Sequence, residues 1–388
     1  MSSHLKLEVS RNNPVFETIT SNGINGILPR HFVESTLPRI GGGVKGLYEN
    51  ENLMGCGFSL PAISSKGNLS YITRGYLLPG QKFDLPEDWL NVEEFRKNQF
   101  HEVVLSRKNG FNIAHPNRTQ AEEAMKLQQQ VWGFNASLYP YDLYRNGSGA
   151  DTRLVALNER NETIGFLLGF IGFGEKWKGD KKGEKYMGFW VESQIAAVDE
   201  RHKENGVAKA LKWEQYDQAK KRGLKLIHWT VDPLQSKNAG LNFGLGAVAA
   251  EFTPNYYSFR NDINRVVASR FGVYWIVDSE RAEKAKTGKL EKKNFFEIKD
   301  AEIIHPLEIS ARLENWHPTS KNILIEIPAD WDGMQQNDLE TAHLWRNTTD
   351  AIFSKIIGIG KGKYIITGRI YRGETPFLIA EEFNEVYK

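Results

Sequence analysis

The chain has few of the features that mark out several large classes of protein. Its single cysteine among 388 residues, Cys56, excludes an internal disulfide framework and fits a reducing compartment. The formal net charge of +2 gives no electrostatic case for nucleic-acid binding. The longest apolar run, residues 164–173, contains glycine and is far shorter than the roughly 20 residues of a membrane span. The N-terminus is polar and lacks the charged-then-apolar order of a secretion signal. We therefore expect a cytoplasmic protein with no membrane partner.

The sequence motifs of several common cofactor sites are also missing. There is no Walker sequence, no dinucleotide-binding fingerprint and no cysteine and histidine cluster at metal-ligand spacing. Two glycine-rich runs do not have the sequence context of a phosphate-binding loop. Residues 40–46 have no predicted helix behind them, and residues 358–363 follow a helix and lead into a strand, which is typical of a helix C-cap. We therefore expect no metal.

The most informative stretch of the chain runs from Ser193 to Gly223. It predicts a short apolar strand, Ile195 to Val198, then a polar turn, Asp199 to Gly206, and then a long helix that begins near Val207. A strand that leads into a helix through a glycine-containing turn points several backbone N–H groups at one spot. The partial positive charge of the helix N-terminus adds to them, so the pattern predicts a pyrophosphate site. Lys203 can place a side-chain charge there.

The spacing of this turn resembles a motif of the GNAT superfamily of acyl-CoA-dependent N-acyltransferases. That motif has a basic residue or glutamine, two other residues, glycine, one other residue, and then glycine or alanine, directly after the fourth strand. The matching residues here are Lys203, Glu204, Asn205, Gly206, Val207 and Ala208. The resemblance implies that these residues bind acyl-CoA, together with the strand residues before them, Ala196, Ala197 and Val198.

A second element follows at the spacing that the resemblance implies. The run LKLIHWTVDP, residues 224–233, predicts the fifth strand, and on the helix after it Asn238 would hydrogen-bond the pantetheine arm of CoA. Many GNAT enzymes carry a tyrosine about seven residues past this asparagine, as the acid that protonates the departing thiolate. Here that position is Leu245, so CoA binding is better supported than the usual proton transfer. The runs WTVDPLQSKN and ILIEIPADW are also shared with a bacterial branch of the superfamily.

Two residues are candidates for the base that takes the proton of an amine. Amide formation from a thioester needs a deprotonated amine, a polarised carbonyl and a thiolate that is tolerated or protonated. Glu192 is the first candidate, because partial burial beside the fourth strand would raise its pKa. The alternative is a strand-entry charge that faces water. His228 on the fifth strand is the second candidate, and its alternative is a core histidine bonded to backbone.

The remaining candidates are an acid and two substrate-binding residues. Tyr256 and Tyr257 follow the sixth strand and could replace the missing helix tyrosine, unless they pack at a rim. Asp232, before Pro233, either binds substrate or caps the next turn. Arg270 either holds a substrate carboxylate or forms a surface ion pair.

The order of elements predicts an α/β fold with a mixed sheet, of GNAT-like type. We divide the chain into a β-rich region 1–108, a GNAT-like acyl-CoA-binding domain 109–280 and an α/β region 281–388. The central domain includes a helix capped by Thr119 and a lysine-rich run, residues 174–185, which we expect to be a solvated hairpin tip. In the region 281–388 we expect a helix with Asp338 as its cap. The two chain ends either pack together as a second, degenerate GNAT-like half or are unrelated appendages that cover sheet edges.

These observations lead to one functional hypothesis and two alternatives. The first is an N-acyltransferase that moves an acyl group, acetyl by default, from acyl-CoA as co-substrate to an amine of a small molecule. The second is a CoA-binding sensor or scaffold with no turnover, which the missing helix tyrosine favours. The third is an acyl-CoA hydrolase or decarboxylase that uses the same site. The sequence does not decide whether the protein is a monomer or a homodimer.

Overall fold

The chain forms two compact units. The computed structural model describes residues 4–8 and 28–383, apart from 79, 82, 83, 98, 99, 101, 109, 134–137, 181, 258–263, 292 and 299. The first unit comprises Met1–Gly174 and Met187–Arg222, and the second comprises Glu175–Tyr186 and Gly223–Lys388. Both units contain helices and strands, so the predicted mixed α/β class is confirmed.

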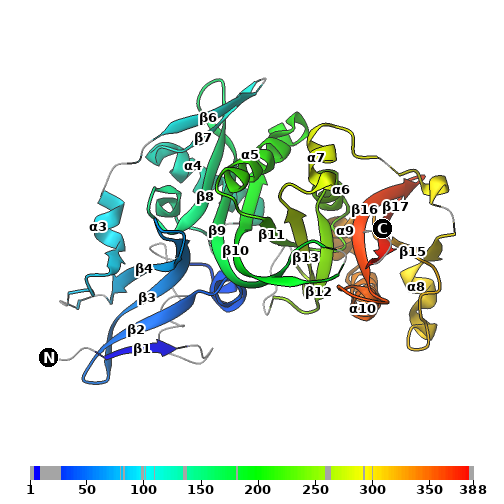
Figure 1. Ribbon diagram of the computed structural model, residues 1–388, viewed down its shortest axis with the longest axis horizontal. Helices are drawn as coiled ribbons and strands as arrows, with labels where there is room; N and C mark the ends of the chain where they lie inside the picture. The colour runs from blue at the N-terminus through cyan, green and yellow to red at the C-terminus, as the bar shows by residue number, and fades with distance from the viewer. Residues whose placement is uncertain are drawn as a thin grey trace. The chain divides into compact units, whose positions relative to one another are not determined.

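The first unit contains two groups of strands (Figure 1). One is a five-stranded sheet in the order β1-β2-β3-β4-β5, antiparallel except for the parallel pair β4 and β5. The other runs in the order β10-β9-β8-β7-β6. The bounds are β1 His4–Glu8, β2 Gly43–Glu49, β3 Asn52–Ile63, β4 Leu69–Leu77, β5 Trp89–Asn91, β6 Val103–Lys108, β7 Phe111–His115, β8 Ala150–Asn158, β9 Thr163–Trp177 and β10 Lys185–Val198.

The two helices that the sequence predicts in the first unit, α4 and α5, begin close to the predicted residues, with one difference in capping. Helix α4 is capped by Asn117, not by Thr119: the Asn117 side chain accepts from the Gln120 N–H, and the Gln120 side chain accepts from the Asn117 N–H. This reciprocal pair satisfies two backbone donors at once. The bounds are a π-helix Phe32–Thr36, α2 Leu37–Arg39, α3 Val92–Lys97, α4 Arg118–Trp132, 3₁₀-helices Tyr141–Tyr144 and Glu200–Asn205, and α5 Val207–Lys221.

The second unit has strands in the order β14-β15-β17-β16-β12-β13-β11. Neighbouring strands are antiparallel except for the parallel pair β14 and β15. A hydrophobic cluster joins Phe295 of a 3₁₀-helix to four residues of the C-terminal strands, Leu324, Ile370, Phe377 and Ile379. The bounds are β11 Leu226–Val231, β12 Val248–Thr253, β13 Arg270–Ile276, β14 Glu302–Ile304, β15 Asn322–Glu326, β16 Tyr364–Arg372 and β17 Thr375–Glu382.

The long helix of the second unit is α10, and its N-terminal cap is the predicted one. Asp338 accepts a hydrogen bond from the backbone N–H of Thr341 at 3.0 Å, which satisfies one of the unpaired donors of the first turn. The helix bounds in this unit are α6 Ser236–Gly244, α7 Glu280–Lys286, α8 Pro306–Ile309, α9 Trp331–Asn337 and α10 Leu339–Ile356, with 3₁₀-helices Phe295–Glu297 and Ser310–Arg312.

The lysine-rich run 174–185 is only in part the solvated hairpin tip that the sequence predicts. The side chains of Lys178, Lys182 and Lys185 are 46%, 72% and 61% exposed, but other residues of the run are packed. Trp177 is 1% exposed and packs edge-on against Tyr274, with ring centroids 5.6 Å apart. A Cβ built on Gly179 would lie 2.5 Å from the side chain of Ile276. The lysines therefore extend from a segment whose aromatic and glycine residues are packed into the second unit.

The second, degenerate GNAT-like half is not confirmed. The N-terminal strands β1–β5 belong to the first unit, whereas residues 281–388 belong to the second. The strands of the C-terminal region continue the sheet of their own unit, because Ile366 of β16 pairs with Ala249 of β12. The predicted central domain, residues 109–280, is divided between the two units. Apart from Glu175–Tyr186, its residues up to Arg222 lie in the first unit, and those from Gly223 lie in the second.

Candidate functional site

The turn between β10 and α5 has the form that the sequence predicts. The Asp199 carboxylate accepts from the backbone N–H of Arg201 at 2.9 Å, and hydrogen bonds from Arg201 are the main reason that the pKa of Asp199 falls to about 2. A short 3₁₀-helix follows, and Gly206 then takes a left-handed conformation with φ +74°. Helix α5 begins at the next residue, so the glycine turns the chain out of the strand and into the helix.

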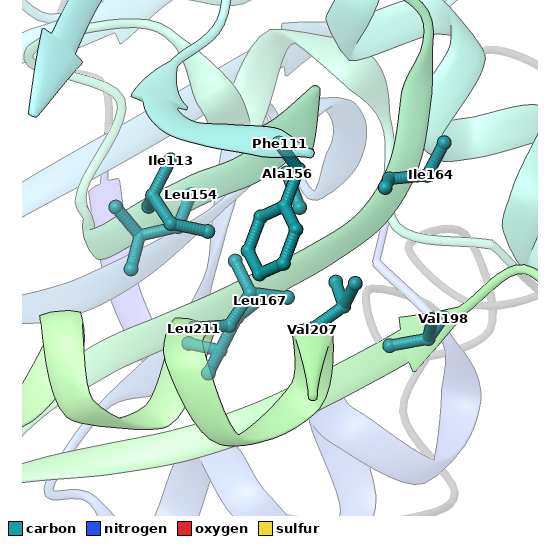
Figure 2. Close-up of a cluster of buried hydrophobic side chains, with 9 residues drawn as sticks. All are labelled: Phe111, Ile113, Leu154, Ala156, Ile164, Leu167, Val198, Val207 and Leu211. Carbon is teal, nitrogen blue, oxygen red and sulfur yellow. The ribbon is translucent and has the colours of Figure 1, made fainter. Parts of the chain in front are cut away.

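A hydrophobic cluster fixes the first turns of α5 on the sheet (Figure 2). Val207 and Leu211 of the helix are both fully buried and pack against side chains from four strands. The strand residues of this cluster are Phe111 and Ile113 of β7, Leu154 and Ala156 of β8, Ile164 and Leu167 of β9, and Val198 of β10. The strand end and the helix N-terminus are therefore held in a fixed relation by packing rather than by the exposed turn.

The N-terminus of α5 has the features of an anion site. Among the described residues no side chain caps it, and the first backbone hydrogen bond of the helix is from Ala210 N–H to Gly206 O. The first N–H groups of a helix have no partner within the helix. A Cβ built on Gly206 meets no atom within 4 Å. An anion can therefore approach the backbone closely here, where the helix dipole favours it.

The other predicted CoA residues of the first unit lie at or near this turn. Lys203 is exposed and donates to the Glu200 carboxylate, so its charge is paired locally. Glu204, Asn205 and Ala196 are exposed, and Ala197 and Ala208 are partly buried. Asn238 is an exposed residue of α6 and belongs to the second unit.

Glu192 is buried and has two polar partners in the first unit. Its side chain is 1% exposed, and Arg39 Nη1 lies 2.8 Å from Oε1 while Trp190 Nε1 donates to Oε2 at 3.2 Å. The alternative role, a strand-entry charge that faces water, is therefore not what the structure has. Both carboxylate oxygens of Glu192 are therefore engaged by side chains of the first unit.

Lys212 of α5 is a second buried charge near Glu192. Its Nζ donates to the Ser193 hydroxyl at 2.8 Å, and the residue is 7% exposed. Burial lowers the pKa of Lys212 to about 7, although the charge of Glu192 acts in the opposite direction. The ammonium group is thus held where desolvation outweighs the nearby carboxylate.

His228 lies in the core of the second unit, where a carboxylate faces it. The residue is fully buried, and its Nε2 lies 3.6 Å from Glu251 Oε2. Its ring meets that of Tyr274 edge-on at 5.1 Å. The sequence predicted either a base or a histidine bonded to backbone, and the contact with Glu251 was not foreseen.

Tyr256, Tyr257 and Arg270 lie beside one another. The two tyrosine rings meet edge-on at 4.9 Å, and Arg270 Cζ lies 4.8 Å from the centroid of the Tyr257 ring. The backbone N–H of Tyr256 donates to the carbonyl of Ala268 at 2.9 Å, which fixes the loop beside β13. Arg270 therefore lies over an aromatic ring, a contact that the sequence did not reveal, and its two expected roles stay predictions.

Asp232 caps the turn after β11, which is one of the two roles that the sequence predicts. Its Oδ1 accepts from the Leu234 N–H at 2.9 Å, and Arg346 Nη2 donates to Oδ2 at 2.6 Å. Both side chains of this ion pair are under 5% exposed. The carboxylate is thus committed to the turn after β11 and to α10.

The partners that the sequence did not reveal are all distant in the chain. Arg39 reaches Glu192, Arg346 reaches Asp232, and Glu251 reaches His228. Among the described residues no group of three or more histidine, cysteine, aspartate or glutamate side chains is placed to hold a metal ion. In the same part of the chain no helix is long and apolar enough to cross a membrane.

Comparison with known proteins gives matches only among solved structures. No protein-family model and no curated protein matches the chain. One similar structure is Ard1 from Thermoplasma volcanium, which is 18% identical and has a TM-score of 0.32 over 44% of this chain and 99% of its own. The ribosomal-protein-S18-alanine N-acetyltransferase from Escherichia coli is 14% identical, with a TM-score of 0.33 over 44% and 95%. Arabidopsis thaliana NAA60 in complex with acetyl-CoA is 15% identical, with a TM-score of 0.34 over 43% and 99%. At TM-scores below 0.5 these likenesses carry no argument about this chain.

Proposed function

We propose that the protein is an acyl-CoA-dependent N-acyltransferase that binds the pyrophosphate of CoA at the N-terminus of α5. The observation that carries this proposal is the turn at Gly206. Its left-handed glycine, the open space beside that glycine and the helix N-terminus without a side-chain cap coincide at the residues of the GNAT-like motif. Each feature is common alone, but the three together suit a diphosphate ligand.

The shape of the turn explains why glycine is needed at this position. A side chain at position 206 would have to adopt a left-handed backbone, and it would project into the space from which a pyrophosphate approaches. The cluster below α5 keeps the helix axis fixed against the sheet. The backbone donors are therefore preorganised, so that little ordering cost accompanies ligand binding.

The acceptor in this proposal is an amine of a small molecule. In the reaction the amine nitrogen bonds to the thioester carbonyl carbon, the carbon–sulfur bond breaks, and the sulfur leaves with the electron pair. The amine loses one proton, and the CoA sulfur takes one up. Backbone N–H groups of β10 near Ile195–Val198 are our candidates for polarising the carbonyl, and Tyr256 or Tyr257 is our candidate for the acid.

The experiment that tests this function follows release of CoA thiol from several acyl-CoAs with and without a panel of amines. We expect slow release that depends on an added amine, because a single missing general acid typically costs 10²–10⁴-fold rather than all activity. Release that needs no amine would replace the proposal with a hydrolase or decarboxylase. CoA binding without release across the whole panel would replace it with the sensor.

The sensor is the second candidate function, and one observation favours it. Position 245, where many GNAT enzymes have the acid, is a buried leucine at the C-terminus of α6. In addition, Glu192 has both carboxylate oxygens engaged by Arg39 and Trp190. A protein that binds CoA without turning it over would need neither group.

A further inference from the structure

Two arginines of the first unit share one aromatic ring, and one of them also pairs with an aspartate. Arg74 comes from β4, Phe95 from α3 and Asp142 from the 3₁₀-helix Tyr141–Tyr144, and Arg145 directly follows that helix. We call these four residues the Arg145 cluster. The guanidinium carbons lie over the Phe95 ring, with Cζ 5.7 Å from the ring centroid for Arg74 and 3.7 Å for Arg145.

The two arginines differ in their hydrogen bonds. Arg74 Nη2 donates to the Asp142 carboxylate, and Arg74 Nη1 donates to the backbone carbonyl of Ser148 at 3.0 Å. In contrast, Nε and Nη1 of Arg145 are buried and have no hydrogen-bond partner among the described residues. The backbone of Arg145 is held, since its N–H donates to the carbonyl of Asp142 at 3.2 Å. The side chain is therefore fixed beside Phe95 with two donors unused.

The charges of the cluster do not balance. Two guanidinium groups, which stay protonated in proteins, face the one carboxylate of Asp142, and that carboxylate pairs with Arg74. One positive charge is left in excess. Arg74 and Asp142 are fully buried and Arg145 is 8% exposed, so water screens this charge poorly. Because a buried charge and buried donors without partners both cost free energy, an anion at Arg145 would be stabilising.

The surroundings of Arg145 indicate which kind of anion fits. A guanidinium group matches the planar oxygens of a carboxylate and can bind both of them. An excess of one positive charge is neutralised by a monoanion. The ring of Phe100, a partly buried residue, has its centroid 5.9 Å from Arg145 Cζ, so a second aromatic ring lies close to the guanidinium. Aromatic neighbours favour a ligand that has an apolar part over a bare inorganic ion.

We propose that Arg145 binds a small organic carboxylate as a monoanion. The carboxylate would accept hydrogen bonds from the Arg145 guanidinium, and its carbon chain would lie against Phe100. Phe95 and the Arg74–Asp142 ion pair are positioning residues, because they hold the Arg145 side chain in place. The proposal adds a ligand site to the first unit and does not depend on the proposed acyltransferase function.

The direct test titrates propionate into the full-length protein and follows binding by ligand-observed NMR, with propionamide as a neutral probe of similar shape. We expect binding of propionate and not of propionamide. Arg145→Gln should weaken propionate binding by about tenfold or more, because hydrogen bonds to a charged group are lost. Arg145→Lys should weaken it severalfold, because lysine keeps the charge but has no planar fork. Inorganic phosphate, doubly charged at mildly alkaline pH, should compete poorly with propionate.

The matched control is Arg118→Gln. Arg118 also lies over an aromatic ring of the first unit, with Cζ 5.4 Å from the centroid of Tyr141, but its side chain is 61% exposed and its Nε already donates to Glu122 at 2.8 Å. This variant should leave propionate binding unchanged. Circular dichroism checks that each variant is folded, and if Arg145→Gln is not, Arg145→Lys and the propionamide comparison decide the matter.

Four results would overturn the proposal. They are a wild type that does not bind propionate, equal binding of propionate and propionamide, wild-type propionate binding by folded Arg145→Gln or Arg145→Lys, and displacement of propionate by phosphate at lower concentration than by propionate itself. An arginine with a structural role alone gives the first of these results. The two proposals fail separately, because CoA binding is tested at Gly206 and propionate binding at Arg145.

Discussion

Replacing Lys212 by methionine should stabilise the protein, and the gain should depend on pH. The lysine is a buried residue of α5, and its pKa falls from 10.5 to about 7 in the folded state because burial disfavours the charged form. In the unfolded chain it regains its ordinary pKa. Between these two values the unfolded state binds more protons than the folded state, so the free energy of unfolding rises with pH.

The size of the effect follows from the shift. Each pKa unit corresponds to 1.36 kcal/mol, so a shift from 10.5 to about 7 amounts to about 5 kcal/mol for the charged form below pH 7. Methionine has a similar length and no charge, but it loses the hydrogen bond to Ser193, which is worth about 1 kcal/mol. We therefore expect Lys212→Met to raise the free energy of unfolding by up to about 4 kcal/mol at pH 6. Above about pH 10.5 this gain should be lost.

The assay is urea denaturation of the wild type and of the Lys212→Met protein at intervals from pH 6 to pH 10.5. Lys209→Met, which changes an exposed lysine of the same helix, is the control and should show little difference at any pH. A Lys212→Met protein that is less stable than the wild type at pH 6 would refute the reasoning. So would a difference that is the same at every pH.

Two further predictions concern the candidate catalytic residues. Glu192→Gln should lower the free energy of unfolding, because Arg39 loses a buried partner. If stability is unchanged and turnover instead falls by ~10²-fold, Glu192 is the base. This is checked by denaturation and by thiol release. Of the two variants Tyr256→Phe and Tyr257→Phe, one should lower amine-dependent thiol release and the other should not, because only one phenol can be the acid. Wild-type rates in both would remove this pair from the mechanism.

Local structure could be predicted well from the sequence. Helix α5 starts at Val207 and α10 is capped by Asp338, as their patterns indicate, because a left-handed glycine and a capping carboxylate act on their own neighbours. The cap of α4 was assigned to Thr119 although Asn117 holds it. Both residues carry a suitable oxygen, and the choice depends on the reciprocal bond with Gln120, which spacing alone does not reveal.

The partners of the candidate residues could not be predicted. Arg39 and Glu192 are far apart in the chain, and nothing in either neighbourhood indicates that they pair. Glu251 faces His228 only because a register shift re-aims it and Gly272 leaves room for it. The packing of Trp177 was missed for a similar reason, since the lysines and glycines around it are typical of a solvated loop.

The proposed function depends most on the CoA site at the N-terminus of α5. A comparison of two glycine variants tests this site directly. Gly206 and Gly223 flank the same helix at its two ends, and both are exposed glycines with left-handed backbones, φ +74° and φ +71°, and open space at Cβ. Valine at either position should cost about 1–2 kcal/mol of stability through the same backbone strain. Calorimetric titration of CoA into the two folded variants should show much weaker binding for Gly206→Val and wild-type binding for Gly223→Val. Wild-type CoA affinity in the Gly206→Val protein would contradict the assignment.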